Sequence, residues 1–537
     1  MQALNRGTQP VACEVRVQLE GADTGDREKF TLTPGVTRVR ALVPDISLPR
    51  SVTVSLVESG GNVLASREQS WQPQRHWKVY LMKSSHEDLG YENYIFHKQR
   101  EIATFIDLAR GFSGPADGAT PNDHYMMESL LFQRNYLEER AESAWREIVE
   151  KHLKTGHMGI FGTPHGVHAH WMDYEELARL TYPGRREAKD RFGLDLKTFL
   201  IVDNPSMSWA GCQAIADAGF RYMARWGQPW RTGGNNDYRA TILPAIFWWV
   251  APNGKSRVLY GWRSGYGISF WFGQARGYGG LLEPGADNVN RILKDIESGA
   301  TLGPYPYDAL VNPEYTDHEI PFPNAGALRE WANRYRYPEI RTDHPERFFA
   351  YMEQKYGAEI PSLAGDLNNF SADYASIDPE SQGWKRRAAR LLPLAEGVAA
   401  LANLLDPAFL PPAALIERTF TRLFDYDEHS WPTLPRANDF QLFNAQWVKQ
   451  HEARRALRGA AEAFAVSFRA FARQIPTGAQ PALAVFNPLA HERTDVVEVE
   501  PGVEGLADPS TGKPVVIQKL PDGRTAFIAE RVPAFGY

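Results

Sequence analysis

The sequence predicts an α/β protein built around a central parallel barrel, on the basis of three observations. Short apolar runs at residues 79–82 and 199–202 are typical of buried parallel strands, and each precedes a polar loop. Residues 10–75 alternate apolar and polar positions, as antiparallel strands do. From about residue 383, apolar side chains recur at helical spacing. We therefore expect a β module, the barrel, a helical bundle and a short C-terminal β segment, in that order.

Composition limits the classes of function. A chain of 537 residues is long enough for several domains. Its net charge of -6 and the lack of any Lys/Arg-rich block argue against a nucleic-acid partner. The N-terminus lacks an apolar signal core and no segment approaches the length of a membrane span, so we expect no membrane association. Cys13 and Cys212 lie far apart in the sequence, and we expect both to be reduced in a cytoplasmic protein.

The N-terminal β module is expected over residues 1–75. Gly60, Gly61 and Asn62 form a hairpin signal between two alternating segments. No residue pattern in this module indicates chemistry, and we expect it to pack on the barrel or to present a surface.

The barrel is expected over residues 76–375, and its chemistry is expected in two loops. His86 and Asp88 follow the first apolar run, and Asp203 follows the second. Because the C-terminal ends of parallel barrel strands face one side, these side chains can converge. Two carboxylates and an imidazole form most of a metal shell of the zinc type. Taken alone, Asp203 could instead be a helix N-cap or a turn residue.

Other barrel segments are assigned from periodicity. Residues 94–112 and 125–154 are long amphipathic stretches that predict helices, and residues 158–161 predict a third short strand. The loop after that strand contains three histidines, His165, His168 and His170. Their placement in a loop favours polar substrate contacts, or no function, over metal ligation. Glu128 lies near the start of a helix, where a negative charge interacts favourably with the helix dipole, and we expect its role to be structural.

The second half of the barrel region contains a strand pair and a loop rich in glycine and aromatics. Two apolar segments joined at Asn253 and Gly254 predict the strand pair. Residues 263–283 are dense in Gly and aromatic side chains. Such a loop can shape a ligand cleft, or it can form an irregular rim.

A three-helix bundle is expected over residues 376–478. The helices are expected at residues 391–405, 412–426 and 439–475. Pro393 is expected to bend the first helix or to delay its start. Residues 479–537 return to β patterning and are expected to begin a C-terminal β domain.

Two stretches carry motifs of a known family. The first stretch reads Ser84, Ser85, His86, Glu87, Asp88, Leu89, Gly90, Tyr91. In the second, Asp203 is followed by a helical segment and then by Gly219 and Phe220. Both resemble the catalytic barrel of glycoside hydrolase family 38, the retaining α-mannosidases. Its members carry H-x-H-x-D-x-G-W at the first position and a D-P-F-G-H-S type loop at the second. The resemblance implies a (β/α)7-type barrel.

The resemblance also implies roles for site residues. His86 and Asp88 fall on zinc ligands of the family, and Asp203 falls on the residue that is both a ligand and the nucleophile. Tyr91 stands where the family has the Trp on which the sugar ring stacks, so it becomes a candidate substrate-binding residue. Ser84 stands in place of the first motif His.

Three further matches extend the resemblance to about residues 77–500. Residues 310–318 resemble the strand and loop of the family's acid/base, which falls on Asp317; a turn role for this Asp is the alternative. His429, in an acidic segment after the second bundle helix, takes the place of the last zinc ligand; a helix C-cap is the alternative. Residues 485–497 resemble the first strands of the family's C-terminal β domain, after which members continue for several hundred residues.

The function implied by the resemblance is a zinc-dependent retaining glycoside hydrolase, most similar to an α-mannosidase, acting on a carbohydrate substrate. One Zn²⁺ per chain would be held by four ligands, His86, Asp88, Asp203 and His429. Asp203 would form a covalent glycosyl intermediate, and Asp317 would act as acid and then as base. Two alternatives stay open. One is a deacetylase-like hydrolase in which the metal activates water, and the other is a non-catalytic carbohydrate-binding relative.

Overall fold

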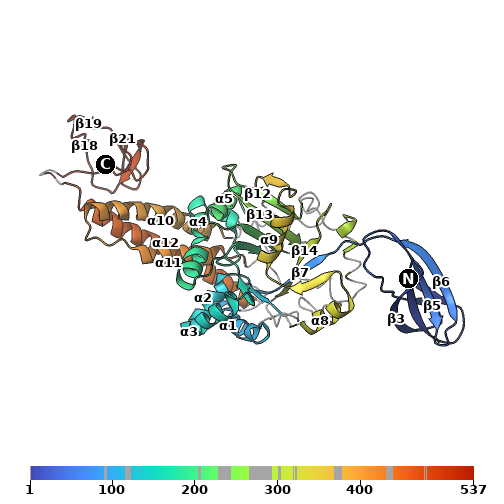
Figure 1. Cartoon of the computed structure of the whole chain (residues 1–537). Coiled ribbons are helices and arrows are strands. Elements are labelled where there is room, and N and C mark those ends of the chain that lie inside the picture. Colours follow the sequence, from blue (N-terminus) through green and yellow to red (C-terminus); the bar gives the residue numbers. More distant parts are fainter. Residues whose placement is uncertain are drawn as a thin grey trace.

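The computed structural model is elongated, with a small β module at each end and an α/β region and a helical region between them (Figure 1). The N-terminus lies in one end module and the C-terminus in the other. The structure describes residues 2–89, 94–114, 123–202, 207–227, 244–264, 304–317, 325–367, 378–430, 439–476 and 481–537, together with short pieces between residues 289 and 323 and residue 478.

Two antiparallel sheets form the N-terminal module. Strand β1 pairs with β4, and the other strands form a sheet in the order β3-β2-β5-β6. The strands are β1 (Gln2–Asn5), β2 (Val11–Leu19), β3 (Ala22–Leu32), β4 (Gly35–Arg38), β5 (Arg50–Glu58) and β6 (Val63–Trp71). The predicted hairpin is confirmed, because β5 pairs with β6 and the Glu58 N–H donates to the Asn62 carbonyl over 2.8 Å.

The central region contains two sheets whose strands are almost all parallel. One sheet has the order β14-β7-β8-β9, with β15 also paired to β7, and the other has the order β10-β11-β13-β12-β16. Among the described strands, only β12 and β13 pair antiparallel here. The strands are β7 (Lys78–His86), β8 (Tyr125–Met127), β9 (Met158–Ile160), β10 (Thr198–Val202), β11 (Tyr222–Gly227), β12 (Ile246–Val250), β13 (Arg257–Ser264), β14 (Ala309–Asp317), β15 (Glu339–Thr342) and β16 (Ser362–Ala364).

Hydrogen bonds connect the two central sheets between β9 and β10. The Gly162 N–H donates to the Thr198 carbonyl over 3.1 Å. The Thr163 hydroxyl donates to the Leu200 carbonyl over 2.7 Å, and the Leu200 N–H donates to the same hydroxyl over 2.8 Å. The region is therefore a mixed α/β fold with adjoining sheets. A closed (β/α)7-type barrel stays a prediction.

Helices surround the central sheets (Figure 1). They are α1 (Ile95–Phe112), α2 (Leu130–Glu139), α3 (Glu142–Ile148), η1 (Val149–Leu153), η2 (Ala169–Trp171), α4 (Tyr174–Arg179), η3 (Pro183–Arg191), α5 (Trp209–Asp217), α8 (Ala325–Arg334) and α9 (Pro345–Tyr356). Helix α9 covers strand N-termini, because Arg221 before β11 donates to Glu353 over 2.7 Å and Lys355 donates to Asp308 before β14 over 2.6 Å. The loops with predicted ligands follow the opposite ends of the strands.

Three helices pack against one another beyond the sheets. They are α10 (Pro379–Leu405), α11 (Ala413–Asp427) and α12 (Asp439–Ala472). Within the described residues, α10 is the one helix whose length and composition would allow a membrane span, which corrects our expectation that no segment reaches that length. Its apolar side chains pack in clusters with side chains of α11 and α12. It also carries Lys385, which is buried, so the helix packs here as the core helix of a helical region does.

The C-terminal residues form short antiparallel strands. The sheets have the orders β17-β21-β20 and β18-β19. The strands are β17 (Arg493–Val499), β18 (Leu506–Ala507), β19 (Pro514–Val515), β20 (Ile517–Lys519) and β21 (Thr525–Val532). The predicted return to β structure within residues 479–537 is confirmed by these strands, and the start of a separate C-terminal β domain stays a prediction.

Two helix predictions need correction. Residues 125–154 do not form one helix: β8 comes first, and extended backbone at Arg140 and Ala141 separates α2 from α3. Pro393 does not delay α10, which begins at Pro379, where the Asp378 carboxylate accepts from the Ser381 N–H over 3.1 Å. This N-cap lies about four turns before Pro393 and lets the helix begin earlier than the apolar period indicates.

Helices α11 and α12 approach closely at Gly459. A Cβ added at Gly459 would lie 2.5 Å from Oγ1 of Thr419, whose β-branched side chain has little rotamer freedom. We expect Gly459→Ala to destabilise the fold by about 1–3 kcal/mol through overpacking. The control is Gly397→Ala in α10, where an added Cβ meets nothing within 4 Å; we expect a small gain there. Thermal unfolding midpoints measure both, and equal midpoints for the two variants would contradict the packing.

Candidate metal centre

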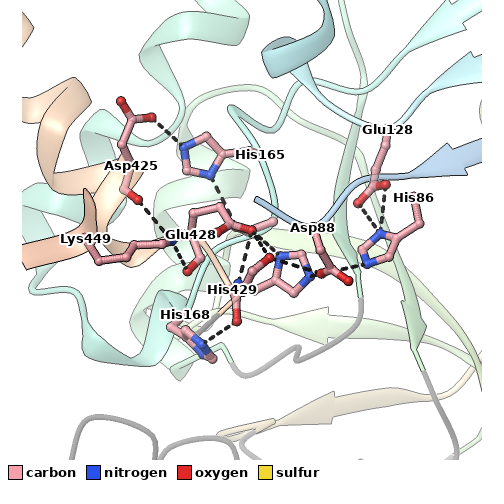
Figure 2. Close-up of polar contacts among 11 residues, drawn as sticks. His86, Asp88, Glu128, His165, His168, Asp425, Glu428, His429 and Lys449 are labelled. Atoms are coloured by element: carbon pink, nitrogen blue, oxygen red, sulfur yellow. Dashed lines mark hydrogen bonds and ion pairs between the residues drawn. The ribbon is translucent and has the colours of Figure 1, made fainter. Parts of the chain in front are cut away.

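Strand β7 carries the first part of the candidate site at its C-terminal end. His86 is its last residue and Asp88 follows in the loop; they are 0% and 6% exposed. The His86 Nδ1–H donates to the Glu128 carboxylate, whose oxygens lie 3.0 and 3.1 Å away. This contact holds the ring with Nε2 directed at Asp88, 3.4 Å from Oδ1 (Figure 2).

His429 lies just after α11 and completes the group. Its Nε2 lies 2.8 Å from Asp88 Oδ1, and its Nδ1 lies 3.0 Å from Glu428 Oε1. The His429 N–H donates to the Gly166 carbonyl over 3.0 Å. A Cβ on Gly166 would lie 2.7 Å from His429 Nδ1, so the close approach of that loop requires glycine.

His86, Asp88 and His429 together fit a metal ion. All three are buried, and one donor atom from each lies within 4.8 Å of the others. Each histidine has its Nδ1 at a carboxylate, Glu128 or Glu428, and its Nε2 at Asp88 (Figure 2). Metal-bound histidines in proteins show the same arrangement, since a carboxylate on the second nitrogen fixes the ring and its tautomer. The group can therefore hold a metal through two imidazole nitrogens and a carboxylate oxygen.

The electrostatics of the group favour a cation. Burial lowers the pKa of His86, but the charges of Glu128 and Asp88 outweigh burial and raise that pKa well above its usual value. For His429, burial is likewise outweighed by Glu428 and Asp88, and the pKa rises to about 10. A metal binds neutral imidazole, so its binding must release these protons.

The turn that carries His429 is held by contacts from other elements. Arg134 of α2 donates to Asp425 Oδ1 over 2.9 Å, and His165 Nε2 lies 3.2 Å from the same oxygen. His168 Nε2 donates to the His429 carbonyl over 3.1 Å. Burial raises the pKa of Asp425, but Arg134 and His165 outweigh it and hold that pKa well below its usual range. His165 and His168 thus contact the backbone and carboxylate of this turn.

Other predicted site residues are described in part or not at all. Asp317 is the last residue of β14, and the parallel register pairs its backbone with His86. The register brings the predicted acid/base position to the strand end that carries the metal group. Asp203 and Tyr91 lie outside the described residues, as does most of the loop at 263–283.

Comparison with known proteins identifies the family. The model for the "Glycosyl hydrolases family 38 N-terminal domain" matches residues 76–372, more than half of the chain. The chain belongs to glycosyl hydrolase family 38. No curated protein sequence matches it.

The fold is similar to that of a solved α-mannosidase structure. An α-mannosidase from Enterococcus faecalis V583 superposes with a TM-score of 0.63 at 15% identity over 86% of this chain. The chain spans 55% of the length of that mannosidase. A 4-α-glucanotransferase from Thermococcus litoralis gives a TM-score of 0.35 at 11% identity, covering 65% of this chain and 54% of that one. A putative polysaccharide deacetylase from Mycobacterium smegmatis gives 0.30 at 12% identity, covering 56% and 96%.

Sequence analysis did not identify the two carboxylates, Glu128 and Glu428, that orient the rings of His86 and His429. Glu128 was expected to favour a helix dipole, but Ser129 is the N-cap of α2 and Glu128 contacts His86. Glu428 was noticed only as an acidic neighbour of His429. The sequence did contain one signal for such a partner: Lys449 falls in the apolar positions of the helix that became α12. A lysine that is buried there needs an acidic partner.

The low pKa of Asp425 predicts a pH-dependent contribution to stability. A carboxyl whose pKa is depressed on folding stabilises the fold above its unfolded pKa, about 3.9, and this contribution is lost as the pH falls toward the folded pKa. We therefore expect Asp425→Asn to lower the thermal midpoint clearly at pH 7, with a difference that shrinks below about pH 4. Asp495→Asn removes an exposed partner of Arg493 and should change little at either pH. A constant difference from pH 7 to pH 3 would contradict this assignment.

Proposed function

We propose that the chain is a zinc-dependent retaining glycoside hydrolase of the α-mannosidase type that removes terminal α-linked sugars from oligosaccharides or glycans. The buried group His86–Asp88–His429 at the end of β7, in a family 38 chain, is the observation that carries the proposal. Catalytic zinc sites use such mixed N and O donors and keep a coordination position for substrate beside the protein ligands.

Asp203 is the proposed fourth ligand and the nucleophile. It follows Val202, the last residue of β10, and β10 adjoins β9 through the contacts of Thr163. A carboxylate at this place would lie on the same side of the sheets as His86, since both follow strand C-terminal ends. Zinc, when bound, supplies charge stabilisation and orients sugar hydroxyls.

The protein's own groups would then divide the reaction into two steps. Asp203 attacks the anomeric carbon and forms a glycosyl ester, while the carboxylic acid of Asp317 gives its proton to the leaving oxygen. Asp317 next takes a proton from water, which displaces Asp203 and restores the free carboxylate. The backbone register of Asp317 beside His86 supports this role. Tyr91 is the proposed aromatic platform for the sugar ring.

The functional units proposed for this activity follow the sequence boundaries. They are residues 1–75, 76–375, 376–478 and 479–537.

Both cysteines are free and buried, which supports a reducing, cytoplasmic location as part of the proposal.

Elemental analysis paired with a panel of aryl glycosides tests the metal and the sugar together. We expect about one zinc per chain, turnover of an aryl α-mannoside, and loss of both in His429→Ala, because truncation removes a ligand. His157→Ala, in the turn before β9, is the control and should keep zinc and activity. Zinc with turnover of acetylated sugars alone would favour the deacetylase alternative. Absence of metal in protein purified without chelators would favour the carbohydrate-binding alternative.

The nucleophile assignment has its own test. We expect Asp203→Ala to reduce turnover by at least about 10⁴-fold, because the covalent step is lost, and to weaken zinc retention. Proton NMR of the first product should show net retention at the anomeric carbon. Early product of inverted configuration, or normal turnover in Asp203→Ala, would overturn this role.

A further inference from the structure

Glu428 connects the metal group to the helical region. The residue is 1% exposed, and its Oε1 lies 3.0 Å from His429 Nδ1. The same oxygen accepts from the Ser430 hydroxyl over 2.7 Å and from the Ser430 N–H over 3.1 Å. The Oε1 oxygen of Glu428 therefore contacts both the ring of His429 and the next residue of the turn, Ser430.

The other carboxylate oxygen faces Lys449 of α12. Lys449 is 2% exposed, and its Nζ donates to Glu428 Oε2 over 2.6 Å. It also donates to two carbonyls of the same turn, Glu428 over 2.8 Å and Asp425 over 3.2 Å (Figure 2). A single ammonium thus fixes both the side chain of Glu428 and the backbone on each side of it.

We propose that Lys449 is a positioning residue for the metal site: through Glu428 it sets the ring of His429 so that Nε2 faces Asp88 and the metal. The inference rests on the proposed function, because it needs a metal at this group. Partners of metal-bound histidines act in this way, and their loss typically weakens metal binding by about 10–100-fold. The partner here is a carboxylate whose own position depends on a helix distant in sequence.

A second buried lysine nearby provides a matched control. Lys385 of α10 is 0% exposed and pairs with Glu176 at 2.9 Å and with Asp427 at 3.1 Å. It therefore also binds a carboxylate of the turn, but that carboxylate is Asp427, which lies one residue before Glu428. Loss of either lysine leaves a buried carboxylate without its cation, so both variants should lose stability. Only the loss of Lys449 should change the orientation of His429.

The test measures metal binding in the full chain without substrate. Zinc dissociation constants are obtained by competition with a chromogenic chelator for the unchanged protein, Lys449→Met, Glu428→Gln and Lys385→Met, below the unfolding temperature of each. We expect Glu428→Gln and Lys449→Met each to raise the constant, by up to about 10–100-fold and with the effect of Lys449→Met no larger than that of Glu428→Gln, while Lys385→Met stays close to the unchanged protein. Cobalt-substituted protein supplies a spectroscopic readout, since altered ligand geometry should shift the visible bands in Lys449→Met and Glu428→Gln but not in Lys385→Met.

The outcomes separate this inference from the proposed function. Unchanged zinc affinity and cobalt spectra in Lys449→Met, with zinc bound by the unchanged protein, would overturn the inference and leave the proposed function standing. Equal losses in Lys449→Met and Lys385→Met would also overturn it, because general loosening would then explain both. No zinc on the unchanged protein would overturn both proposals. If Lys449→Met does not fold, Lys449→Gln measured against Lys385→Gln decides in the same way.

Discussion

Compensation of buried charge is the constraint on which the candidate site depends. Asp88, Glu128 and Glu428 are carboxylates no more than 6% exposed, and each lies within 3.4 Å of a histidine nitrogen. Burying such groups without a partner costs several kcal/mol per ion, so each must face a cation or a donor. The imidazoles of His86 and His429 meet that need from β7 and from the turn after α11. Buried acids therefore dictate where these rings lie and which nitrogen faces Asp88.

The same constraint connects elements that are far apart in the sequence. The turn from Asp425 to Ser430 receives Arg134 from α2, Lys385 from α10 and Lys449 from α12. Each cation neutralises one carboxylate of the turn, and moving α10 or α12 would leave a buried charge, on Asp427 or Glu428, without its lysine. Stability of the helical region and geometry of the metal group are therefore coupled. A histidine that lies after a helix can serve a site on another element because its surroundings fix it from several sides.

Sequence reasoning could predict those parts of the molecule that depend on local pattern. The apolar runs that became β7 and β10 and the helical period of α11 and α12 were sufficient, since buried strands and amphipathic helices carry their own signal. The prediction of one helix over residues 125–154 was wrong. A short strand followed by two helices with extended residues between them gives nearly the same spacing of apolar side chains as one helix. His86, Asp88 and His429 came from family motifs. Glu128, Glu428 and Lys449 carry no motif, because a buried ion pair is defined by contacts across elements.

The charge balance of the group also bears on how it could accept a metal. Asp88, Glu128 and Glu428 surround the two imidazoles and raise the pKa of each, so the group favours positive charge at the rings. A divalent cation that displaces the two ring protons carries the same charge into the same space. The carboxylates would thus meet positive charge in either case, and the rings need not turn, because Nδ1 of each ring lies at its acid and Nε2 lies toward Asp88. A site that exchanges protons for a metal at nearly constant charge requires little rearrangement of the buried residues around it.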